Sequence, residues 1–462
     1  MSHRSAVVIG AGFAGLLTAA AAAQTGARVT VFERDRLSDA PDPRHGVPQG
    51  EQPHVLLHRG LRALESLLPG VERDLLDVGG VKINTGRMPW LSPYGWFPVD
   101  PPSYEIVSLT RPLLELVVRR RVLADESIDL RQGARVSSLA RAGQRWEIQC
   151  ADGSAAFADL VVDASGRSSR LRHWLDELGV AVPEPATVDA KLGYAARRYR
   201  APAPVPLRSG VVIAASPYTE AGALVLPVEN QDWLVGAVGY GSKRPPRDPA
   251  ELDTYLRQLR DPAVAELAAV LEPVGDVALY RQTGNRRYAY GHTRSWPVGL
   301  LVVGDALCAF NPVYGQGITV AACQAELLRA QLRERLSPDT PLSAADTRRI
   351  QRRLHDVTDL PWAVATGEDL RYRSSDAKPS RWQRLSAVWT TRMTQLAVAG
   401  DPACRDAISR LYHLMATTRA LIGPGVVLAM ARSLVRGLPP PAPRPAVLDW
   451  LTAGEADRAA DP

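Results

Sequence analysis

Residues 5–15 read SAVVIGAGFAG, and this stretch decides the fold because a short apolar run leads directly into three spaced glycines. Residues 16–24 are rich in leucine and alanine and predict a helix, and residues 28–33 (RVTVFE) predict a second strand. Strand, glycine turn, helix and strand in this order are typical of a dinucleotide-binding βαβ unit.

The glycines of this unit and the acid that ends it each have a physical role. Gly10 permits the tight turn, Gly12 lets a pyrophosphate approach the backbone, and Gly15 lets helix and strand pack closely. The free N–H groups at the helix start suit phosphate, and Glu33 can accept hydrogen bonds from ribose hydroxyls, with Arg34 beside it. The motif predicts a dinucleotide site but does not distinguish NAD from FAD.

Composition places the chain among ordinary globular proteins. It has 462 residues, of which 46% are hydrophobic and 23% charged. No apolar run has the ~20 residues that a membrane-spanning helix needs. The alanine-rich N-terminal run resembles a secretory signal, but its glycines mark it as the first strand and helix of a domain. Four separated cysteines without a CxxC pair predict neither disulfides nor a metal site, so we expect a cytoplasmic protein.

A net charge of +6 raises the question of nucleic-acid binding. Only four of the 55 basic residues are lysines, and the arginines are spread along the chain, with a short cluster at 119–121. This pattern favours solvated surface arginine, so we expect no nucleic-acid partner.

Two further segments have the same strand-to-turn character. Residues 160–163 form an apolar strand that runs into Asp163-Ala-Ser-Gly166. Residues 298–303 form another, which ends at Gly304-Asp305. The following stretch 311–317 (NPVYGQG) leads into a helix at 318–335, whose N–H groups would stabilise an anion.

The rest of the chain divides by pattern. Alternating strands joined by turns predict an inserted β-sheet substrate domain at 183–290, and the segments 1–182 and 291–335 predict one α/β Rossmann-like domain. Residues 336–462 predict a helical C-terminal region with a partly disordered tail. Within it, 426–438 is amphipathic and basic; packing against the body is the expected role, with peripheral membrane contact as the alternative.

Aromatic residues gather at 88–97 in a chain that is only 6% aromatic. The segment is either a corner of the core or an apolar substrate wall. As substrate contacts we single out five side chains: His54, Trp90, Tyr94, Trp96 and Tyr314.

Taken together, the three glycine- and aspartate-containing motifs resemble the FAD-dependent monooxygenases of the aromatic-hydroxylase fold. Segments 44–49 (RHGVPQ), 93–96 (PYGW) and 285–287 (NRR) look closer to the flavin epoxidases of bacterial polyether biosynthesis. The resemblance implies an enzyme that reduces FAD with NADPH or NADH. A flavin C4a-hydroperoxide then transfers one oxygen atom of dioxygen to an apolar polyketide, terpenoid or aromatic substrate.

The resemblance also assigns residues. Arg111 would reach the FAD phosphates or ribityl chain, Val136 would lie beside the adenine, and Asp305 would bind ribityl hydroxyls. Arg44 would lie near the flavin ring. The remaining matches are the loop under that ring and the second motif: Pro312, Gly315, Gly317, Asp163 and Gly166.

One departure from the family pattern leaves alternatives open. The hydroxylases carry Asp-Gly in the second motif, where this chain has Ser165-Gly166 with the aspartate at Asp163. Halogenases and some reductases share this arrangement, so reduced flavin could come from a partner reductase. Alkene epoxidation is the reaction that we expect. Aromatic hydroxylation, a reductase or halogenase activity, and a non-catalytic flavin-binding partner protein are the alternatives.

Overall fold

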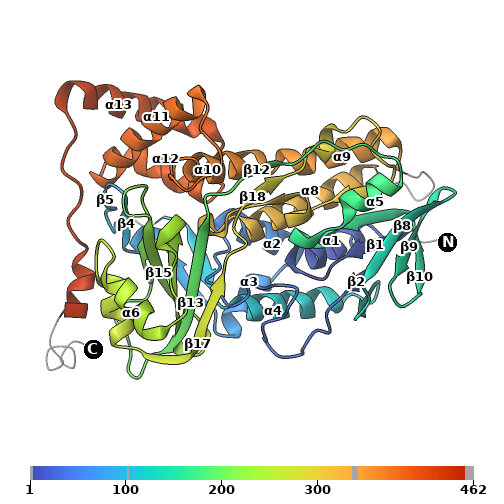
Figure 1. The fold of residues 1–462 in the computed structure, drawn as a ribbon, viewed down its shortest axis with the longest axis horizontal. Helices are drawn as coiled ribbons and strands as arrows, with labels where there is room; N and C mark the ends of the chain where they lie inside the picture. Colours follow the sequence, from blue (N-terminus) through green and yellow to red (C-terminus); the bar gives the residue numbers. More distant parts are fainter. Residues whose placement is uncertain (1–3, 101–102, 336–341, 453–462) are drawn as a thin grey trace.

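A five-stranded parallel sheet carries all three motifs in the computed structural model, which describes residues 4–100, 103–335 and 342–452 (Figure 1). In spatial order its strands are β19 (Leu300–Val302), β11 (Leu160–Asp163), β1 (Ser5–Ile9), β2 (Arg28–Glu33) and β7 (Ile128–Gln132). The central strand β1 pairs in parallel with β11 on one side and β2 on the other. The carboxyl ends of the three motif strands therefore meet at one edge of the sheet, where α/β folds bind ligands.

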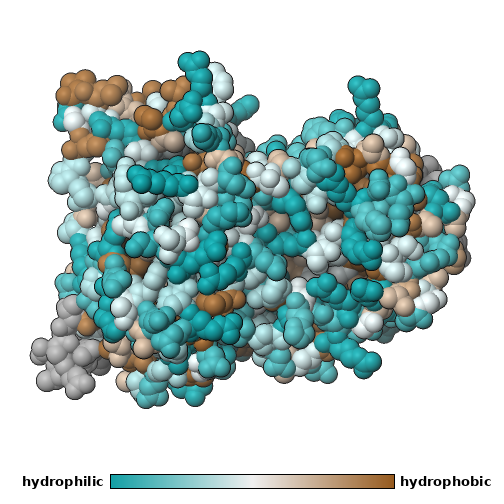
Figure 2. Space-filling view, in the orientation of Figure 1, coloured by the Kyte–Doolittle hydropathy of each residue, from teal (hydrophilic) through white to brown (hydrophobic). Residues whose placement is uncertain are grey.

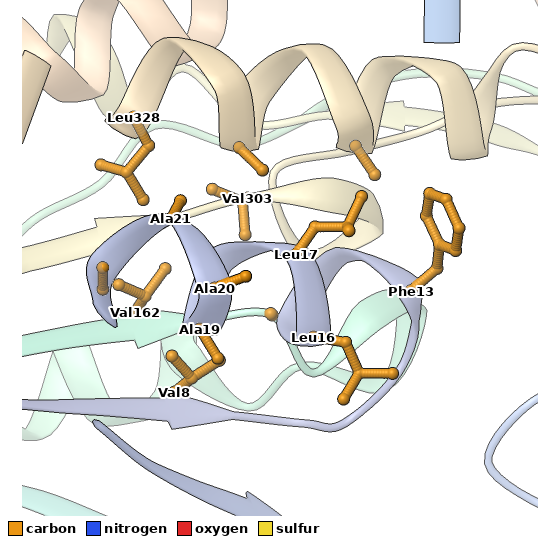
Figure 3. Close-up of a cluster of buried hydrophobic side chains, with 14 of the residues drawn as sticks. Val8, Phe13, Leu16, Leu17, Ala19, Ala20, Ala21, Val162, Val303 and Leu328 are labelled. Atoms are coloured by element: carbon orange, nitrogen blue, oxygen red, sulfur yellow. The ribbon is translucent and has the colours of Figure 1, made fainter. Parts of the chain in front are cut away.

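Helix α1 (Phe13–Ala23) is apolar on every side because it is covered on two sides. Val8 and Val162 of the sheet lie beneath it, and Leu328 of α8 (Gly317–Arg335) lies above it (Figure 3). Leu17 is fully buried between these layers. Burial of one such leucine stabilises the fold by about 2 kcal/mol.

A second sheet of seven strands stands beside the first (Figure 1). Its order is β17 (Glu272–Tyr280), β13 (Leu192–Arg200), β16 (Asp232–Tyr240), β15 (Ala221–Pro227), β14 (Val211–Ile213), β4 (Trp90–Ser92) and β5 (Gly95–Trp96). Helices α6 (Pro249–Arg257) and α7 (Ala263–Ala269) pack on it through leucines and valines. The sheet thus takes its edge hairpin, β4 and β5, from the aromatic segment far earlier in the chain.

Smaller elements join the two sheets. Antiparallel strands form three further groups: β3 (Val81–Asn84) with β6 (Glu105–Ser108); β8 (Val136–Ala142), β9 (Arg145–Cys150) and β10 (Ala155–Ala158); and β12 (Ala186–Val188), β18 (Asn285–Arg287) and β20 (Cys308–Ala309). The remaining helices of this part are α2 (His58–Leu67), α3 (Val71–Asp77), α4 (Arg111–Leu123) and α5 (Leu171–Glu177). Helix α2 begins at His58, and the preceding residues 54–57 form no helix or strand and border the site described below.

The C-terminal region is helical, as expected. It consists of α9 (Ala344–Asp356), α10 (Asp359–Asp369), α11 (Arg381–Val398), α12 (Pro402–Tyr412) and α13 (Pro424–Arg436). The tail then returns to the second sheet, where Leu448 and Leu451 are buried. Part of the tail predicted to be disordered, 453–462, lies outside the described residues.

The predicted class, an α/β Rossmann-like domain with a second sheet and a helical C-terminal region, is confirmed. The exact domain boundaries stay a prediction. No helix within the described ranges combines the length and apolar character needed to cross a bilayer. The face in Figure 2 is mainly polar, with apolar side chains gathered at the corner that carries α13.

Candidate functional site

A cavity of about 590 Å³ opens at the edge where the motif strands end. It is bordered by the glycine turn before α1, the turn after β11 and the 304–317 segment before α8. Thirteen of the residues singled out from the sequence line it: Gly10, Gly12, Glu33, Arg34, Arg44, His54, Arg111, Val136, Gly166, Asp305, Pro312, Gly315 and Gly317. Segments from distant parts of the chain thus meet at one site.

Two glycines of the first motif have different structural roles. Gly12 caps α1 without a side-chain hydrogen bond, and a Cβ placed there would meet only the Arg44 guanidinium, at 3.8 Å. The space above Gly12 is therefore open to a ligand, beside the free N–H groups of the helix. A Cβ on Gly15 would lie 1.8 Å from the carbonyl oxygen of Gly10. Gly15 therefore lies behind the cavity and permits helix packing.

Glu33 ends β2 with both carboxylate oxygens held. One accepts from the backbone N–H of Ala11 at 2.7 Å, and the other accepts from the backbone N–H of Asp35 at 3.0 Å. These bonds fix the carboxylate beside the glycine turn, where the oxygen that accepts from Asp35 keeps a lone pair for a further donor. The geometry suits a ribose hydroxyl.

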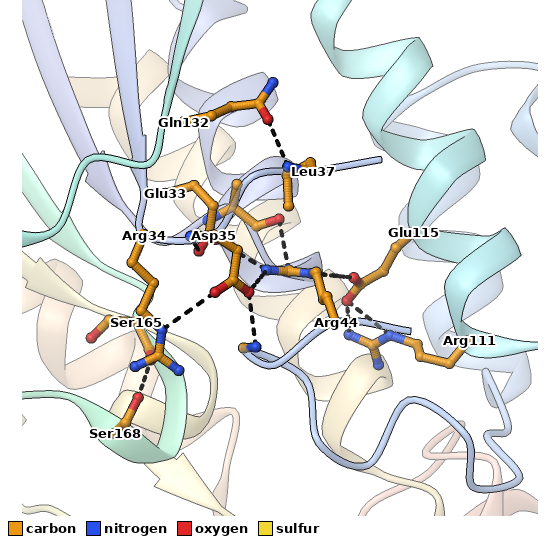
Figure 4. A network of polar contacts seen from close by, with 12 residues as sticks. Glu33, Arg34, Asp35, Leu37, Arg44, Arg111, Glu115, Gln132, Ser165 and Ser168 are labelled. Carbon is orange, nitrogen blue, oxygen red and sulfur yellow. Dashed lines mark hydrogen bonds and ion pairs between the residues drawn. The ribbon is translucent and has the colours of Figure 1, made fainter. Parts of the chain in front are cut away.

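Arg44 lies at the centre of a network of charges (Figure 4). Its guanidinium contacts Glu33 at 3.3 Å, Asp35 at 3.1 Å and Glu115 at 3.4 Å. Burial disfavours the charged form, but Glu115, Glu33 and Asp35 outweigh it and raise the pKa of Arg44. Its Nη2 donates to the carbonyl oxygen of Ala11 at 3.3 Å, at the glycine turn, and the place of Arg44 near the flavin ring stays a prediction. The three carboxylates draw its guanidinium to the glycine turn.

Arg111, at the start of α4, is buried against Glu115 one turn later. Its Nε and Nη2 donate to one Glu115 oxygen at 3.0 and 2.6 Å. Glu115 loses solvation, yet Arg111 and Arg44 more than compensate and hold its pKa below the usual range. The Glu115 carboxylate thereby fixes two cationic side chains at the cavity wall.

The opposite end of the cavity is formed by the loop 311–317. Gly315 has a φ of 64°, a conformation that glycine adopts without strain. The Asn311 side chain accepts from the N–H of Val313 at 3.2 Å and donates to both oxygens of Asp369 in α10 at 3.0 Å. The hydroxyl of Tyr314 donates to the same carboxylate at 3.0 Å. The helical C-terminal region therefore holds this loop in place.

Arg167 connects the second motif with the third. It donates to the carbonyl oxygen of Gly284 at 2.8 Å and to that of Phe310. Its Nε lies 3.5 Å from an Asp305 oxygen at the cavity wall. Asp305 is partly exposed there and can accept from hydroxyl groups of a ligand.

His54 lines the cavity from the segment before α2. Its Nδ1 donates to the carbonyl oxygen of Gln52 at 2.8 Å, an assignment made because a carbonyl can only accept. Burial and then the positive charge of Arg111 lower the pKa of His54 to about 4. The ring is therefore neutral at physiological pH, and Nε2 is an acceptor.

Asp163, predicted as a cofactor contact, lies behind the cavity wall. It is fully buried and accepts from the side-chain hydroxyls of Ser165 and Ser169 at 2.5 Å each. Burial raises its pKa, and these bonds oppose that shift. Its role in this geometry is to shape the turn that ends with Gly166.

The aromatic segment does not reach this cavity. Trp96 is buried in the core of the second sheet, and Trp90 stacks edge-on against Tyr412 at 5.0 Å. Tyr94 bonds to Thr391 of α11 at 3.0 Å. Their places in the β4–β5 hairpin turn them toward the C-terminal helices. Tyr314 belongs to the loop 311–317, but its hydroxyl donates to Asp369.

Sequence reasoning missed Glu115, Arg167 and Asp369. Glu115 could have been found, since it lies one helical turn after Arg111. Arg167 directly follows the second motif. No local pattern connects Asp369 with residues 58 positions earlier in the chain.

The described residues fit FAD. The open space above Gly12 would accept a pyrophosphate, Glu33 a ribose, and Asp305 a hydroxylated chain. The loop 312–317, at the start of α8, would lie under a flat ring system. The cavity's volume lies within the range typical of cofactor sites.

Comparison with known proteins agrees with this geometry. Residues 8–55 match the family model of the NAD(P)-binding Rossmann-like domain, and residues 157–355 match that of squalene epoxidase. Protein Rv3254 of Mycobacterium tuberculosis is 30% identical over 431 residues, which are 89% of each chain.

Solved structures share the fold. The flavoprotein/dehydrogenase of Cytophaga hutchinsonii superposes with a TM-score of 0.65 at 13% identity, covering 94% of this chain and 99% of that one. The flavin-dependent brominase Bmp2 gives 0.65 at 14%, covering 94% and 100%. PqsL of Pseudomonas aeruginosa, described as a probable FAD-dependent monooxygenase, gives 0.58 at 18%, covering 80% and 98%.

Proposed function

The chain belongs to the same family as Protein Rv3254 and is a flavin-dependent monooxygenase of the aromatic-hydroxylase fold, and from this premise we propose that it epoxidises an alkene in an apolar substrate. The observation that carries the proposal is the cavity that joins the glycine turn of α1 to the loop before α8. The match of residues 157–355 to the squalene epoxidase model supports an alkene rather than an aromatic ring as the reacting group.

The residues of the cavity have separable tasks in this proposal. Gly12 and the start of α1 bind the pyrophosphate, while Glu33 binds the adenosine ribose. The 312–317 loop and Asp305 orient the ring and its side chain. Bound FAD, once reduced, supplies the electrons that activate dioxygen.

Water exclusion is the chain's other contribution. Pro53, Val55, Phe310 and Ile318 give part of the cavity an apolar lining, and His54 beside them is uncharged. An apolar lining keeps water from the reacting oxygen and admits an alkene. No side chain needs to act as nucleophile in this reaction.

Electrons come from NADPH or NADH in this proposal, either at this chain or through a separate flavin reductase. Ser165-Gly166 in place of Asp-Gly is the feature that bears on this choice. Mixing the purified FAD-loaded protein with NADPH or NADH without oxygen, and following the flavin absorbance, separates the two routes. Direct reduction within seconds favours binding here, and reduction only after a reductase is added favours the partner.

The decisive experiment uses ¹⁸O₂. The FAD-loaded enzyme, a reductant and squalene or a shorter trisubstituted alkene are incubated, and the product is analysed by mass spectrometry. One ¹⁸O atom per product in an epoxide supports the proposal. A phenol formed from an aromatic probe indicates hydroxylation, and a product that needs added bromide or chloride indicates a halogenase. Product without ¹⁸O overturns monooxygenation.

A further inference from the structure

Two helices of the C-terminal region leave large apolar side chains in solvent. On α11, Trp382 is 81% exposed, and Leu385 and Val388 follow it at helical spacing. On α13, Leu434 and Val435 are 83% and 87% exposed. The two helices contact one another, and Figure 2 shows apolar side chains gathered at this corner of the molecule.

Helix α13 buries small residues and exposes large apolar ones, which is the reverse of an ordinary surface helix. Its buried residues are Val426, Ala429 and Ser433, which are mostly small. Its larger apolar residues, among them Leu428 and Leu434, point outward. A helix that packed for stability alone would bury the leucines, so its apolar outer face fits contact with something other than water.

Charge accompanies this apolar surface. Residues 377–448 contain ten lysines or arginines and two acidic residues, whereas the whole chain has 55 and 49. Asp401 caps α12, and Asp406 pairs with Arg410 at 3.6 Å, so both acids lie on α12 and neither on α11 nor α13. The chain's positive charge is therefore concentrated where the apolar side chains are exposed.

Five arginines on or between α11 and α13 are available to bind an anion. They are Arg381, Arg384, Arg419, Arg432 and Arg436, and all are exposed. None of them forms an ion pair with a carboxylate in the part of the chain that the structure describes. Basic side chains around exposed leucine, valine and tryptophan are the combination by which a helix lies in the interface of an anionic membrane.

We propose that the α11–α13 surface docks on an anionic lipid bilayer. It is defined by Trp382, Leu385, Val388, Ile422, Leu428, Leu434 and Val435 with the five arginines named above. The apolar side chains enter the headgroup boundary, and the arginines contact lipid phosphates. The proposal does not depend on which oxygenation the enzyme performs.

The test is co-sedimentation of the full-length, FAD-loaded protein with vesicles of phosphatidylcholine alone or with 30% phosphatidylglycerol. We expect at least tenfold tighter binding to the anionic vesicles, weakened by 0.5 M NaCl. The double variant Leu434→Ser/Val435→Ser should lower that binding at least tenfold, because each side chain loses its buried apolar area. Arg432→Glu/Arg436→Glu should lower it by a similar factor.

Matched controls keep the result specific. Tyr218→Ser removes a side chain that is 89% exposed on another loop, and Arg73→Glu reverses an exposed charge on α3. Both should bind vesicles as the parent does, and circular dichroism should show all variants folded. Vesicle binding that is absent, or unchanged in both double variants, overturns the proposal. So does a concentration-dependent dimer in ultracentrifugation that Leu434→Ser/Val435→Ser abolishes, since the surface would then bind a second copy.

Discussion

The side-chain amide of Asn311 donates to both carboxylate oxygens of Asp369 at 3.0 Å, across 58 residues of sequence. Asn285 donates to the same carboxylate at 2.7 Å. Burial raises the pKa of Asp369 to about 6, although the bonds from Asn311, Asn285 and Tyr314 oppose the shift. A buried carboxylate in α10 thus tethers the loop that borders the cavity.

This pKa predicts how stability depends on pH. The folded protein binds the Asp369 proton more tightly than the unfolded chain, whose aspartate has an ordinary pKa of 3.8. The contribution of Asp369 to the free energy of unfolding is therefore largest below pH ~4 and falls as the pH rises to ~6. We expect the difference between parent and Asp369→Asn to fall by about 1–3 kcal/mol over this interval in urea unfolding.

The Asp77→Asn variant is the control for general loss of negative charge, since Asp77 is exposed on α3 and paired with Arg73 at 3.7 Å. If the difference between parent and Asp369→Asn is flat or rises between pH 4 and 6, Asp369 is not the buried acid described here.

Substitution by alanine should weaken FAD binding at Gly12 and lower the free energy of unfolding at Gly15. Gly12 has an extended backbone with φ −73° and open space for a methyl group, so Gly12→Ala should fold normally but hold FAD at least about tenfold more weakly. In Gly15→Ala the new Cβ would lie 1.8 Å from a carbonyl oxygen, so the free energy of unfolding should fall by about 3 kcal/mol or more. Flavin absorbance after gel filtration and thermal unfolding of the apoprotein measure the two effects. Normal FAD retention by Gly12→Ala would show that the pyrophosphate lies elsewhere.

Glu115 should be required for stability at neutral pH. Arg111 and Arg44 keep its pKa low despite burial, so its stabilising contribution is present above pH ~4.3 and is lost as the pH falls through its lower folded value. Glu115→Gln leaves two buried guanidinium groups without their shared partner and should cost about 3 kcal/mol at pH 7. A double-mutant cycle with Arg111→Gln isolates the pair. A coupling energy near zero would contradict this assignment.

The meeting of the glycine motifs at one cavity was predictable because their signals are local. Glycine spacing, a strand before each turn and an acid at the end of β2 identify Gly12, Glu33 and Asp305 without any tertiary contact. Long-range pairing was not predictable. The hairpin of Trp90 and Trp96 pairs with β14, a strand more than a hundred positions later in the chain, and this pairing turns these side chains away from the cavity.

The excess of arginine over acid in residues 377–448 can be counted in the sequence, but only the fold shows which apolar side chains beside these arginines are exposed. The contacts of Arg44 were not predictable because a single arginine has no sequence period. Its position follows from Glu33, Asp35 and Glu115, which meet only in the folded chain.

His54 should remain neutral throughout the physiological pH range. Its pKa of about 4 and its Nδ1–H bond to Gln52 predict one fixed tautomer with Nε2 unprotonated. Nitrogen-15 NMR of the labelled protein, with the His54 signals identified by their loss in His54→Gln, should show no titration between pH 5.5 and 8. A histidine peptide titrated in the same buffer gives the reference curve. A His54 inflection near pH 6.5 would mean that the ring can charge beside Arg111 and could serve as a proton donor in the cavity.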